Sequence, residues 1–258
     1  MRPLREAQLA GVHGLAFDVD DTLTTGGRLT APAYDALCRL AEAGLELVAV
    51  TGRPLGWTDG FAASWPIRVA VGENGAGWAW RDGHALRVGY ADEEDERRAQ
   101  RERLDGIRAA VREQMPDVIE SADSGARRCD VAFDVGESRQ LPPDRVDALV
   151  RLIEARGARA TVSSVHAHAV PGRWNKATGI VRALTEVAGA PPELARWVFV
   201  GDSGNDAAAF AAFERSVGVA NVSAHLERLP CPPRFVTERA RGEGFVELAE
   251  ALLEARRG

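Results

Sequence analysis

Two stretches of the chain alternate buried strands with amphipathic helices, and about 90 residues of a different pattern separate them. The first stretch runs from the apolar segment VHGLAFDV (12–19), through a helix-like segment (30–44), to a second apolar segment, LELVAV (45–50). The helix-like segment begins with a threonine cap and an early proline, and it ends at Gly44. Apolar strands joined by a helix at this spacing predict a parallel sheet with helices on its faces.

The same pattern returns near the end of the chain. It predicts a helix over 175–189, strands over 196–200, 216–220 and 233–237, and a closing helix over 244–256. We therefore expect an α/β fold whose core is a Rossmann-like, doubly wound parallel sheet built from residues 1–76 and 169–258.

The residues between the two stretches, 77–168, predict an inserted α+β domain. GWAWRDGHALRVG (77–89) is typical of a hairpin around Asp82–Gly83. A charge-rich helix (92–114) follows, and we interpret its charges as a solvated face. A strand (127–135), a helix (142–157) and more strand (159–170) complete the insert.

Composition excludes several classes of function. The net charge is −6 and the arginines are spread along the chain, which argues against a nucleic-acid partner. No window of 18 apolar residues exists, so we expect no membrane span, and the first residues lack a signal-peptide pattern. Three distant cysteines, Cys38, Cys129 and Cys231, are typical of reduced thiols, so the cytoplasm is the expected location. His166 and His168 share one face of a strand but do not make a closed zinc site.

Acidic residues follow strands at both ends of the chain. Asp18 and Asp20 end the first strand, and Asp202 and Asp206 follow the strand over 196–200. Ligands of doubly wound sheets bind outside the carboxyl ends of the strands, so these carboxylates are expected to share one small volume. Each aspartate alone could be a helix cap or a turn former, but that explanation accounts poorly for paired aspartates at two distant strand ends. Crowded carboxylates are the oxygen ligands that Mg²⁺ prefers.

Four segments in order, DVDDTLT (18–24), TGR (51–53), a distant lysine and GDSGND (201–206), resemble the motifs of the haloacid dehalogenase superfamily. The position of the insert resembles the class IIB cap, found in Cof-type sugar-phosphate phosphatases, mannosyl-3-phosphoglycerate and sucrose-phosphate phosphatases, and phosphomannomutase. The resemblance covers essentially the whole chain.

The resemblance implies roles for the residues at the matching positions. Asp18 would be the nucleophile that forms an aspartyl-phosphate, and Asp20 would be the general acid and then the base for water. Mg²⁺ would be held by Asp18, Asp202 and the backbone carbonyl of Asp20, with Asp206 holding a water on the metal. Thr51 would hydrogen-bond the phosphoryl group. The further candidates for contact with substrate or phosphate are Gly52, Arg53, Asn205 and Asn221.

Lys176 is the only lysine among 32 basic residues. A compact ammonium can approach several oxygens at once, which the wider, planar guanidinium of arginine does less well. The resemblance implies that Lys176 bridges the nucleophile and the phosphoryl oxygens, and its place near a helix start also favours anions.

The sequence departs from the family in places. Asp21 stands where most relatives have glycine, so its charge faces solvent or tunes the site, and Ser203 stands where many Cof-type members have glycine. Glu73 and Asn74 contact substrate or form a hinge, and Asn221 lies beside phosphate or forms a turn. Core packing is the better interpretation for at least half of the tryptophans Trp57, Trp78, Trp80 and Trp174.

The sequence thus predicts an Mg²⁺-dependent phosphatase that acts on a small phosphorylated substrate, a sugar phosphate or phosphorylated sugar acid, as a monomer or homodimer. Two alternatives stay open: a phosphomutase similar to phosphomannomutase, and a non-catalytic protein that binds sugar phosphates. Pure binding needs no acid–nucleophile pair, which argues against the second.

Overall fold

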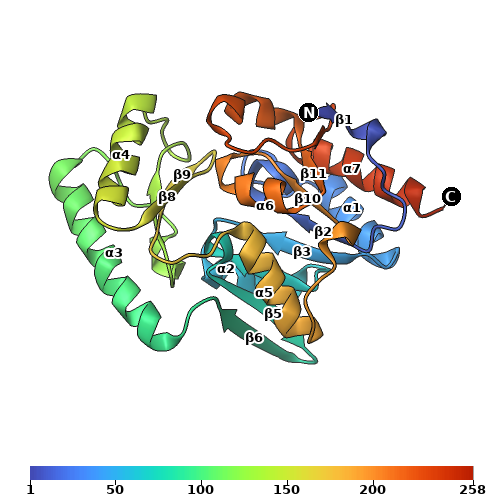
Figure 1. Ribbon diagram of the computed structural model, residues 1–258, viewed down its shortest axis with the longest axis horizontal. Coiled ribbons are helices and arrows are strands. Elements are labelled where there is room, and N and C mark those ends of the chain that lie inside the picture. The colour runs from blue at the N-terminus through green and yellow to red at the C-terminus, as the bar shows by residue number, and fades with distance from the viewer. Residues whose placement is uncertain (258) are drawn as a thin grey trace.

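The computed structural model describes residues 1–257, with Arg228 described through its backbone only (Figure 1). Its largest element is a nine-stranded sheet with the order β1-β12-β11-β10-β2-β3-β4-β5-β6. Every neighbouring pair from β1 to β4 is parallel, and β5 and β6 are antiparallel additions at one edge. The strands are β1 (Arg2–Pro3), β2 (Gly14–Phe17), β3 (Glu46–Val50), β4 (Val69–Gly72), β5 (Gly77–Asp82), β6 (Ala85–Tyr90), β10 (Trp197–Gly201), β11 (Arg215–Gly218) and β12 (Phe235–Val236).

Helices cover both faces of this sheet because its central strands are apolar on both sides. In β2, Leu15 and Phe17 face a cluster that includes α1 (Ala31–Glu42) and α7 (Arg241–Ala255), whereas Ala16 faces α5 (Lys176–Ala188) and α6 (Ala207–Ala212). A further helix, α2 (Leu55–Ser64), packs on β4 and β5. The predicted doubly wound α/β core is confirmed.

The insert forms a second body, on the left of Figure 1, while both chain termini lie on the opposite side of the molecule. Its three-stranded antiparallel sheet has the order β7-β9-β8, and two helices pack with it around one apolar cluster. These elements are α3 (Glu94–Gln114), β7 (Val131–Asp134), α4 (Pro143–Ala155), β8 (Arg159–Val162) and β9 (His166–Val170). Short helical turns lie at Leu4–Glu6, Val19–Leu23, Glu73–Gly75, Ser124–Ala126, Leu194–Arg196, Gly204–Asp206 and Ala220–Arg228.

The hairpin β5–β6 lies elsewhere than the sequence analysis placed it. Residues 77–90 were assigned to the insert, but β5 pairs with β4 and therefore extends the large sheet. The apolar Trp78 and Ala79 bury against core helices, which gives this hairpin its place on the core. We propose that the core comprises residues 1–90 and 171–258, with position 258 outside the described residues, and that the insert comprises residues 91–170.

The strand register gathers the candidate residues. Phe17 of β2 is aligned with Val200 of β10 on one side and with Ala49 of β3 on the other. Three neighbouring strands therefore end at the same level, and the residues that follow them emerge at one edge of the sheet. None of the helices in residues 1–257 is long and apolar enough to cross a lipid bilayer.

Candidate active site

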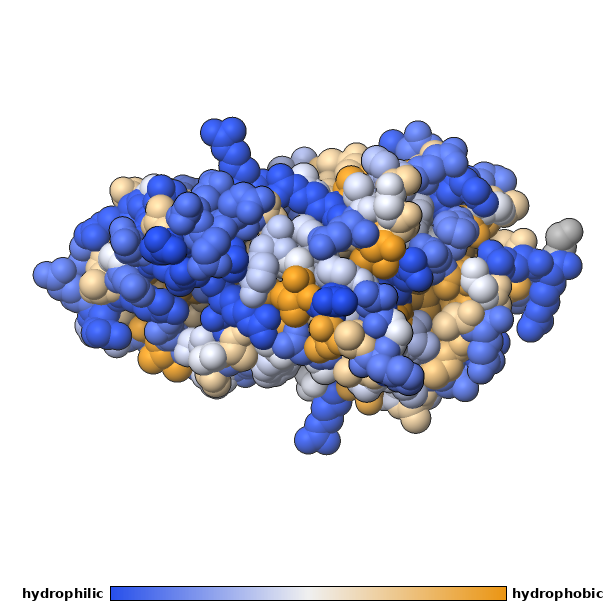
Figure 2. Space-filling view, turned by 90° about the horizontal axis from the view of Figure 1, so that it is seen from below, coloured by the Kyte–Doolittle hydropathy of each residue, from blue (hydrophilic) through white to orange (hydrophobic). Residues whose placement is uncertain are grey.

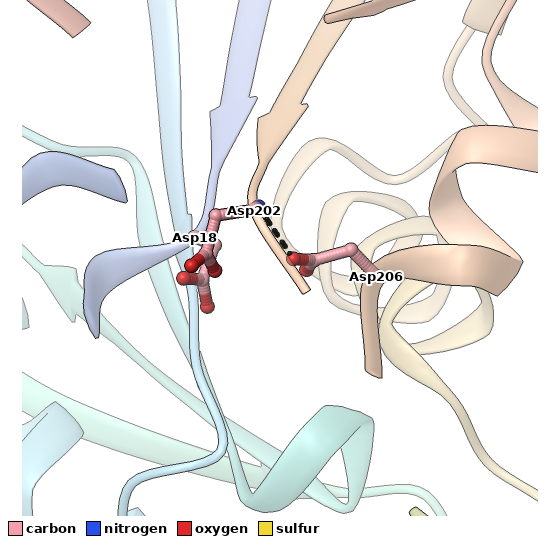
Figure 3. Close-up of side chains that lie close together, drawn as sticks. All are labelled: Asp18, Asp202 and Asp206. Carbon is pink, nitrogen blue, oxygen red and sulfur yellow. Dashed lines mark hydrogen bonds between the residues drawn. The ribbon is translucent and has the colours of Figure 1, made fainter. Parts of the chain in front are cut away.

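Three carboxylates meet where β2 and β10 end. Asp18 follows β2, Asp202 follows β10, and Asp206 closes the short turn after it (Figure 3). Each offers an oxygen within 4.8 Å of the others, and all three side chains are buried. The structure thus brings together three of the four aspartates that the sequence analysis placed in one volume, and Asp20 is not among them.

Lys176 lies between two of these carboxylates. Its Nζ donates to Asp18 Oδ1 at 2.5 Å and to Asp206 Oδ1 at 2.7 Å, and the side chain is fully buried. Lys176 is the first residue of α5, and Asn175 caps that helix by accepting the Thr178 N–H. Burial alone lowers the pKa of an ammonium, but Asp18 and Asp206 outweigh it and raise the pKa of Lys176 above its ordinary value.

The loop after β10 holds Asp206 and Asp202 in fixed orientations. Asp206 Oδ2 accepts the backbone N–H groups of Asp202 at 2.9 Å and Ser203 at 3.0 Å. A β-carbon at Gly201 would lie 2.5 Å from the Asp206 carboxyl carbon, so this position needs glycine. Asn221 donates to Asp202 Oδ2 at 2.8 Å and to the carbonyl of Asp21 at 3.0 Å, which places Asn221 in the site rather than in a remote turn.

The carboxylate cluster fits a hard divalent cation. Asp202 Oδ1 is buried and finds no hydrogen-bond partner among the described residues. Burial, the largest influence, raises the pKa of Asp18 to about 7, with Lys176 acting in the opposite direction. Burial, Asp18 and Asp206 together raise the pKa of Asp202 well above its ordinary value. A divalent cation with oxygen ligands would relieve this crowding.

Asp20 lies outside the group of three carboxylates and binds Arg53. The guanidinium makes a bidentate pair with Asp20, with both N–O distances 2.9 Å. Its third nitrogen, Nη1, donates to Glu137 Oε1 at 2.7 Å, and Glu137 belongs to the insert. Arg53, a candidate for substrate contact, therefore links the expected general acid to the cap.

The second motif lies beside the carboxylates. Thr51 is fully buried after β3, and its hydroxyl accepts the Arg53 N–H at 3.0 Å. Gly52 lines a small cavity of about 10 Å³ together with Asp18, Asp20 and Asn205. Asn205 donates to Asn74 Oδ1 at 3.0 Å, so the fourth motif contacts the segment before β5.

Asp21 occupies a left-handed backbone conformation, with φ 53° and ψ 15°. Such a conformation favours glycine, and aspartate is among the few other residues that tolerate it, which accounts for the departure from the family pattern. Its carboxylate lies 3.2 Å from Arg241 Nε and accepts the Gly26 N–H at 3.3 Å. The side chain therefore pairs with Arg241 at the start of α7 and is not part of the carboxylate cluster.

Glu73 joins the core to the cap. Its fully buried carboxylate accepts the N–H of Leu55 from the core and those of Arg128, Cys129 and Asp130 from the insert. These contacts support the hinge interpretation over substrate contact. Of the tryptophans, Trp78 and Trp174 are buried, Trp80 is half-buried and Trp57 is exposed.

Sequence reasoning missed the part that the cap plays in the site. His166 and His168 of β9 line the small cavity, and Glu137 accepts from Arg53. The alternation in HAHAV, with histidines on one face of a strand between two halves of a sheet, is the signal that could have indicated them.

Known proteins resemble this chain over nearly its whole length. It is 28% identical over 235 residues to a phosphoglycolate phosphatase of Methanoculleus marisnigri, covering 90% of this chain and 93% of that protein. It is 28% identical over 257 residues to a phosphoglycolate phosphatase of Methanothrix thermoacetophila, covering 95% and 98%. A search of family models found no match.

Solved structures share the fold at low sequence identity. Thermoplasma acidophilum 0175 superimposes with a TM-score of 0.70 at 19% identity, covering 94% of this chain and 98% of that one. The sucrose-phosphatase of Synechocystis sp. PCC6803, in complex with sucrose and phosphate, gives a TM-score of 0.64 at 17% identity, covering 93% and 98%. A haloacid dehalogenase-like hydrolase from B. subtilis gives 0.63 at 16% identity, covering 92% and 99%.

The ordered motifs, the gathered carboxylates and the relatives agree in one assignment. The chain is similar in sequence to phosphatases and shares the fold of haloacid dehalogenase-like hydrolases, which supports a phosphoric monoester hydrolase of that superfamily with a cap of the Cof type.

Proposed function

We propose that the protein is an Mg²⁺-dependent phosphatase of a small sugar phosphate or phosphorylated sugar acid, acting through an aspartyl-phosphate on Asp18. The observation that carries this proposal is the contact of Lys176 with Asp18 and Asp206 inside a buried carboxylate cluster. A cation beside the nucleophile would neutralise phosphoryl oxygens as the Asp18 carboxylate attacks phosphorus.

In the first step an oxygen of Asp18 forms a bond to phosphorus and the bond to the leaving oxygen breaks. Asp20 gives its proton to that oxygen, so the alcohol leaves neutral. In the second step Asp20 takes a proton from water, the water attacks phosphorus, and the bond to Asp18 breaks to release phosphate. Thr51, Gly52 and Asn205 would orient the phosphoryl group.

The metal would be held by Asp18, Asp202 and the Asp20 carbonyl, with Asp206 beside them. When bound, it would supply positive charge to the phosphoryl oxygens. The unpartnered Asp202 Oδ1 and the all-oxygen donor set support this choice of ion.

The cap must move during turnover. The cavity beside Asp18 and Asp20 is about 10 Å³, which leaves too little room for a phosphoryl group. Since Arg53 engages both oxygens of Asp20, the acid role also requires Arg53 to release Asp20 when substrate enters. Opening at the Arg53–Glu137 contact would make room for the phosphoryl group, and closure would then exclude water.

Phosphate release from a panel of sugar phosphates, phosphoglycerates, 2-phosphoglycolate and an aryl phosphate tests this proposal. We expect turnover with Mg²⁺, loss with chelator, and loss in Asp18→Asn. The phosphomutase alternative predicts an isomerised sugar phosphate without free phosphate, and a pure binding protein predicts binding without turnover. Cytoplasmic location and a monomeric or homodimeric state belong to the same proposal.

A further inference from the structure

A buried histidine of the cap lies beside the active site. His168 of β9 is almost fully buried, and its Nδ1 lies 2.9 Å from Asp130 Oδ2. Its other ring nitrogen, Nε2, is buried and finds no hydrogen-bond partner within residues 1–257. Buried polar atoms are normally paired, so this nitrogen is free to accept a hydrogen bond from a bound molecule.

The unpaired nitrogen faces the reacting residues. A β-carbon at Gly52 would lie 3.0 Å from His168 Nε2, so this nitrogen lies against the second-motif loop. His168 and Gly52 line the same small cavity as Asp18 and Asp20. A group bound to Nε2 would therefore lie close to the scissile bond.

The surroundings of His168 fix which kind of group it binds. Asp130 also accepts from Arg127 at 2.8 Å. Burial raises the pKa of Asp130, but Arg127 and His168 outweigh it, so this carboxylate is ionised and only accepts. Burial lowers the pKa of His168 to about 4, so the ring is neutral at pH 7. The proton lies on Nδ1, and Nε2 is left as an acceptor.

We infer that His168 is a specificity-determining residue whose Nε2 accepts a hydrogen bond from a substrate hydroxyl on the carbon next to the phosphoester carbon. Phosphate and carboxylate oxygens offer only acceptors at neutral pH, whereas a hydroxyl offers the donor that Nε2 requires. The inference rests on the proposed phosphatase function and deepens it. It favours polyol, sugar or hydroxy-acid phosphates over 2-phosphoglycolate, which has no hydroxyl.

A larger cavity beside the first one could hold the rest of such a substrate. A cavity of about 700 Å³ between cap and core shares Ser163, Ser164 and Asn205 with the small cavity. Its walls are largely apolar, with Val146 and Val150 of the cap facing Ala207 and Ala208 of the core. The small cavity near His168 would hold the polar end of the substrate, and the larger cavity would hold the rest of the leaving group.

The test compares substrates that differ by one hydroxyl. Phosphate release from 3-phosphoglycerate is measured against its 2-deoxy analogue, and release from glycerol 3-phosphate against 3-hydroxypropyl phosphate. We expect the hydroxylated member of at least one pair to have a kcat/KM about 10- to 100-fold higher, the range for an unpaired buried acceptor. His168→Asn keeps a donor for Asp130 but removes the group at Nε2, so it should abolish that preference between the paired substrates.

His168→Gln extends an amide oxygen toward the Nε2 position and should restore part of the preference. This variant also keeps the inference testable if His168→Asn does not fold. The matched control is His84→Asn, at an exposed position on the hairpin. Phosphate release without a hydroxyl preference in the wild type overturns this inference and leaves the phosphatase intact, as does a preference that survives in His168→Asn. Release from no compound overturns the proposed function itself, and this inference with it.

Discussion

Lys176 Nζ lies 2.5 Å from Asp18 Oδ1, although 158 residues separate the two in sequence. The contact forms because α5 begins beside the edge where β2 ends, and the side chain is enclosed by protein on all sides. An ammonium fits between two carboxylates here because it is compact and donates in three directions. This geometry gives a physical reason for the one lysine in a chain whose other basic residues are all arginine.

Replacing Lys176 by arginine should therefore not be conservative. The larger, planar guanidinium would have to enter a fully buried space, which costs about 1–3 kcal/mol of stability. We expect Lys176→Arg and Lys176→Met each to lower kcat by about 10²–10³, in the range for loss of one group that stabilises transition-state charge. Initial rates of phosphate release at saturating Mg²⁺ measure the effect.

The matched control is Arg98→Lys on α3, where the side chain is largely exposed and pairs only loosely with Asp95. That exchange should leave both rate and stability within error. A Lys176→Arg protein with wild-type kcat would show that the position needs only a positive charge.

The sequence was sufficient to predict the core and the carboxylate cluster of Asp18 and Asp202 because both depend on local pattern. Apolar runs mark buried strands, and the carboxyl ends of parallel neighbours lie at one edge, so Asp18 and Asp202 had to meet once β2 and β10 paired. The roles of Arg53 and His168 depend on how the cap lies on the core. No periodicity encodes that placement, so Glu137 and Asp130 could not be assigned to them.

Two further features follow from backbone geometry that residue types only suggest. Asp21 takes a left-handed backbone conformation that usually favours glycine. The sequence alone did not indicate that the carboxylate of this aspartate pairs with Arg241. The hairpin around Gly83 was identified as a hairpin, but its partner strand was not, because both edges of a sheet offer the same hydrogen bonds. Figure 2 shows hydrophobic side chains gathered near the middle of one face, with hydrophilic side chains over much of the rest.

Asp202→Asn should separate metal binding from fold stability. Without metal, the asparagine should raise the free energy of unfolding by about 1–2 kcal/mol at pH 8, because it removes one charge from a buried cluster and keeps an oxygen for Asn221. Mg²⁺ at about 100 times its Kd should stabilise the wild type by about 2.7 kcal/mol and leave the variant unchanged. Thermal unfolding with Mg²⁺ or chelator measures both effects, with Asp95→Asn as the exposed control. An equal Mg²⁺ response in Asp202→Asn would contradict the assignment.

Glu73→Gln should destabilise the protein more than an ordinary surface change. The amide nitrogen of glutamine would replace one carboxylate oxygen and face backbone N–H groups that now donate to it, leaving buried donors unpaired. We expect a loss of about 2–4 kcal/mol, since each unsatisfied buried group costs about 1–3 kcal/mol. Urea unfolding measures this loss, and Glu96→Gln on the exposed face of α3 is the control. A change below that of the control would mean that the four contacts of Glu73 contribute no net stability.

Glu137→Gln should loosen the cap without touching the reacting residues. It removes the charge that binds Arg53 at 2.7 Å and His166 at 2.8 Å, while the Arg53–Asp20 pair stays intact. We expect faster hydrogen exchange in segments 127–138 and 163–168, by a factor of about 3–10 for the loss of a partly buried pair of about 1 kcal/mol. Mass spectrometry of exchanged peptides measures this, with Glu113→Gln on α3 as the exposed control. Unchanged exchange in both segments would show that this ion pair does not hold the cap closed.

His168 should make the protein less stable as the pH falls from 6.5 to 4. Burial, the largest influence, lowers its pKa to about 4, whereas the unfolded chain titrates near the ordinary value of 6.5. Between these values the unfolded state binds one more proton than the folded state, so the free energy of unfolding rises with pH across this window. The full effect is on the order of 3 kcal/mol, from a shift of about 2.5 pH units. Arg127 and His166 face the ring and oppose its protonation, while Asp130 favours it.

The measurement is urea unfolding of the wild type and His168→Asn at half-unit steps from pH 4 to 7. The asparagine does not titrate, so its profile should be flatter than the wild-type profile by about one proton over this range. His84→Asn removes an exposed histidine and should leave the profile unchanged. Parallel profiles for the wild type and His168→Asn would mean that His168 takes up its proton without unfolding, and its ring would then also be able to donate to a phosphoryl oxygen. The pH profile therefore tests independently the neutral state of His168 on which its choice of a hydroxyl depends.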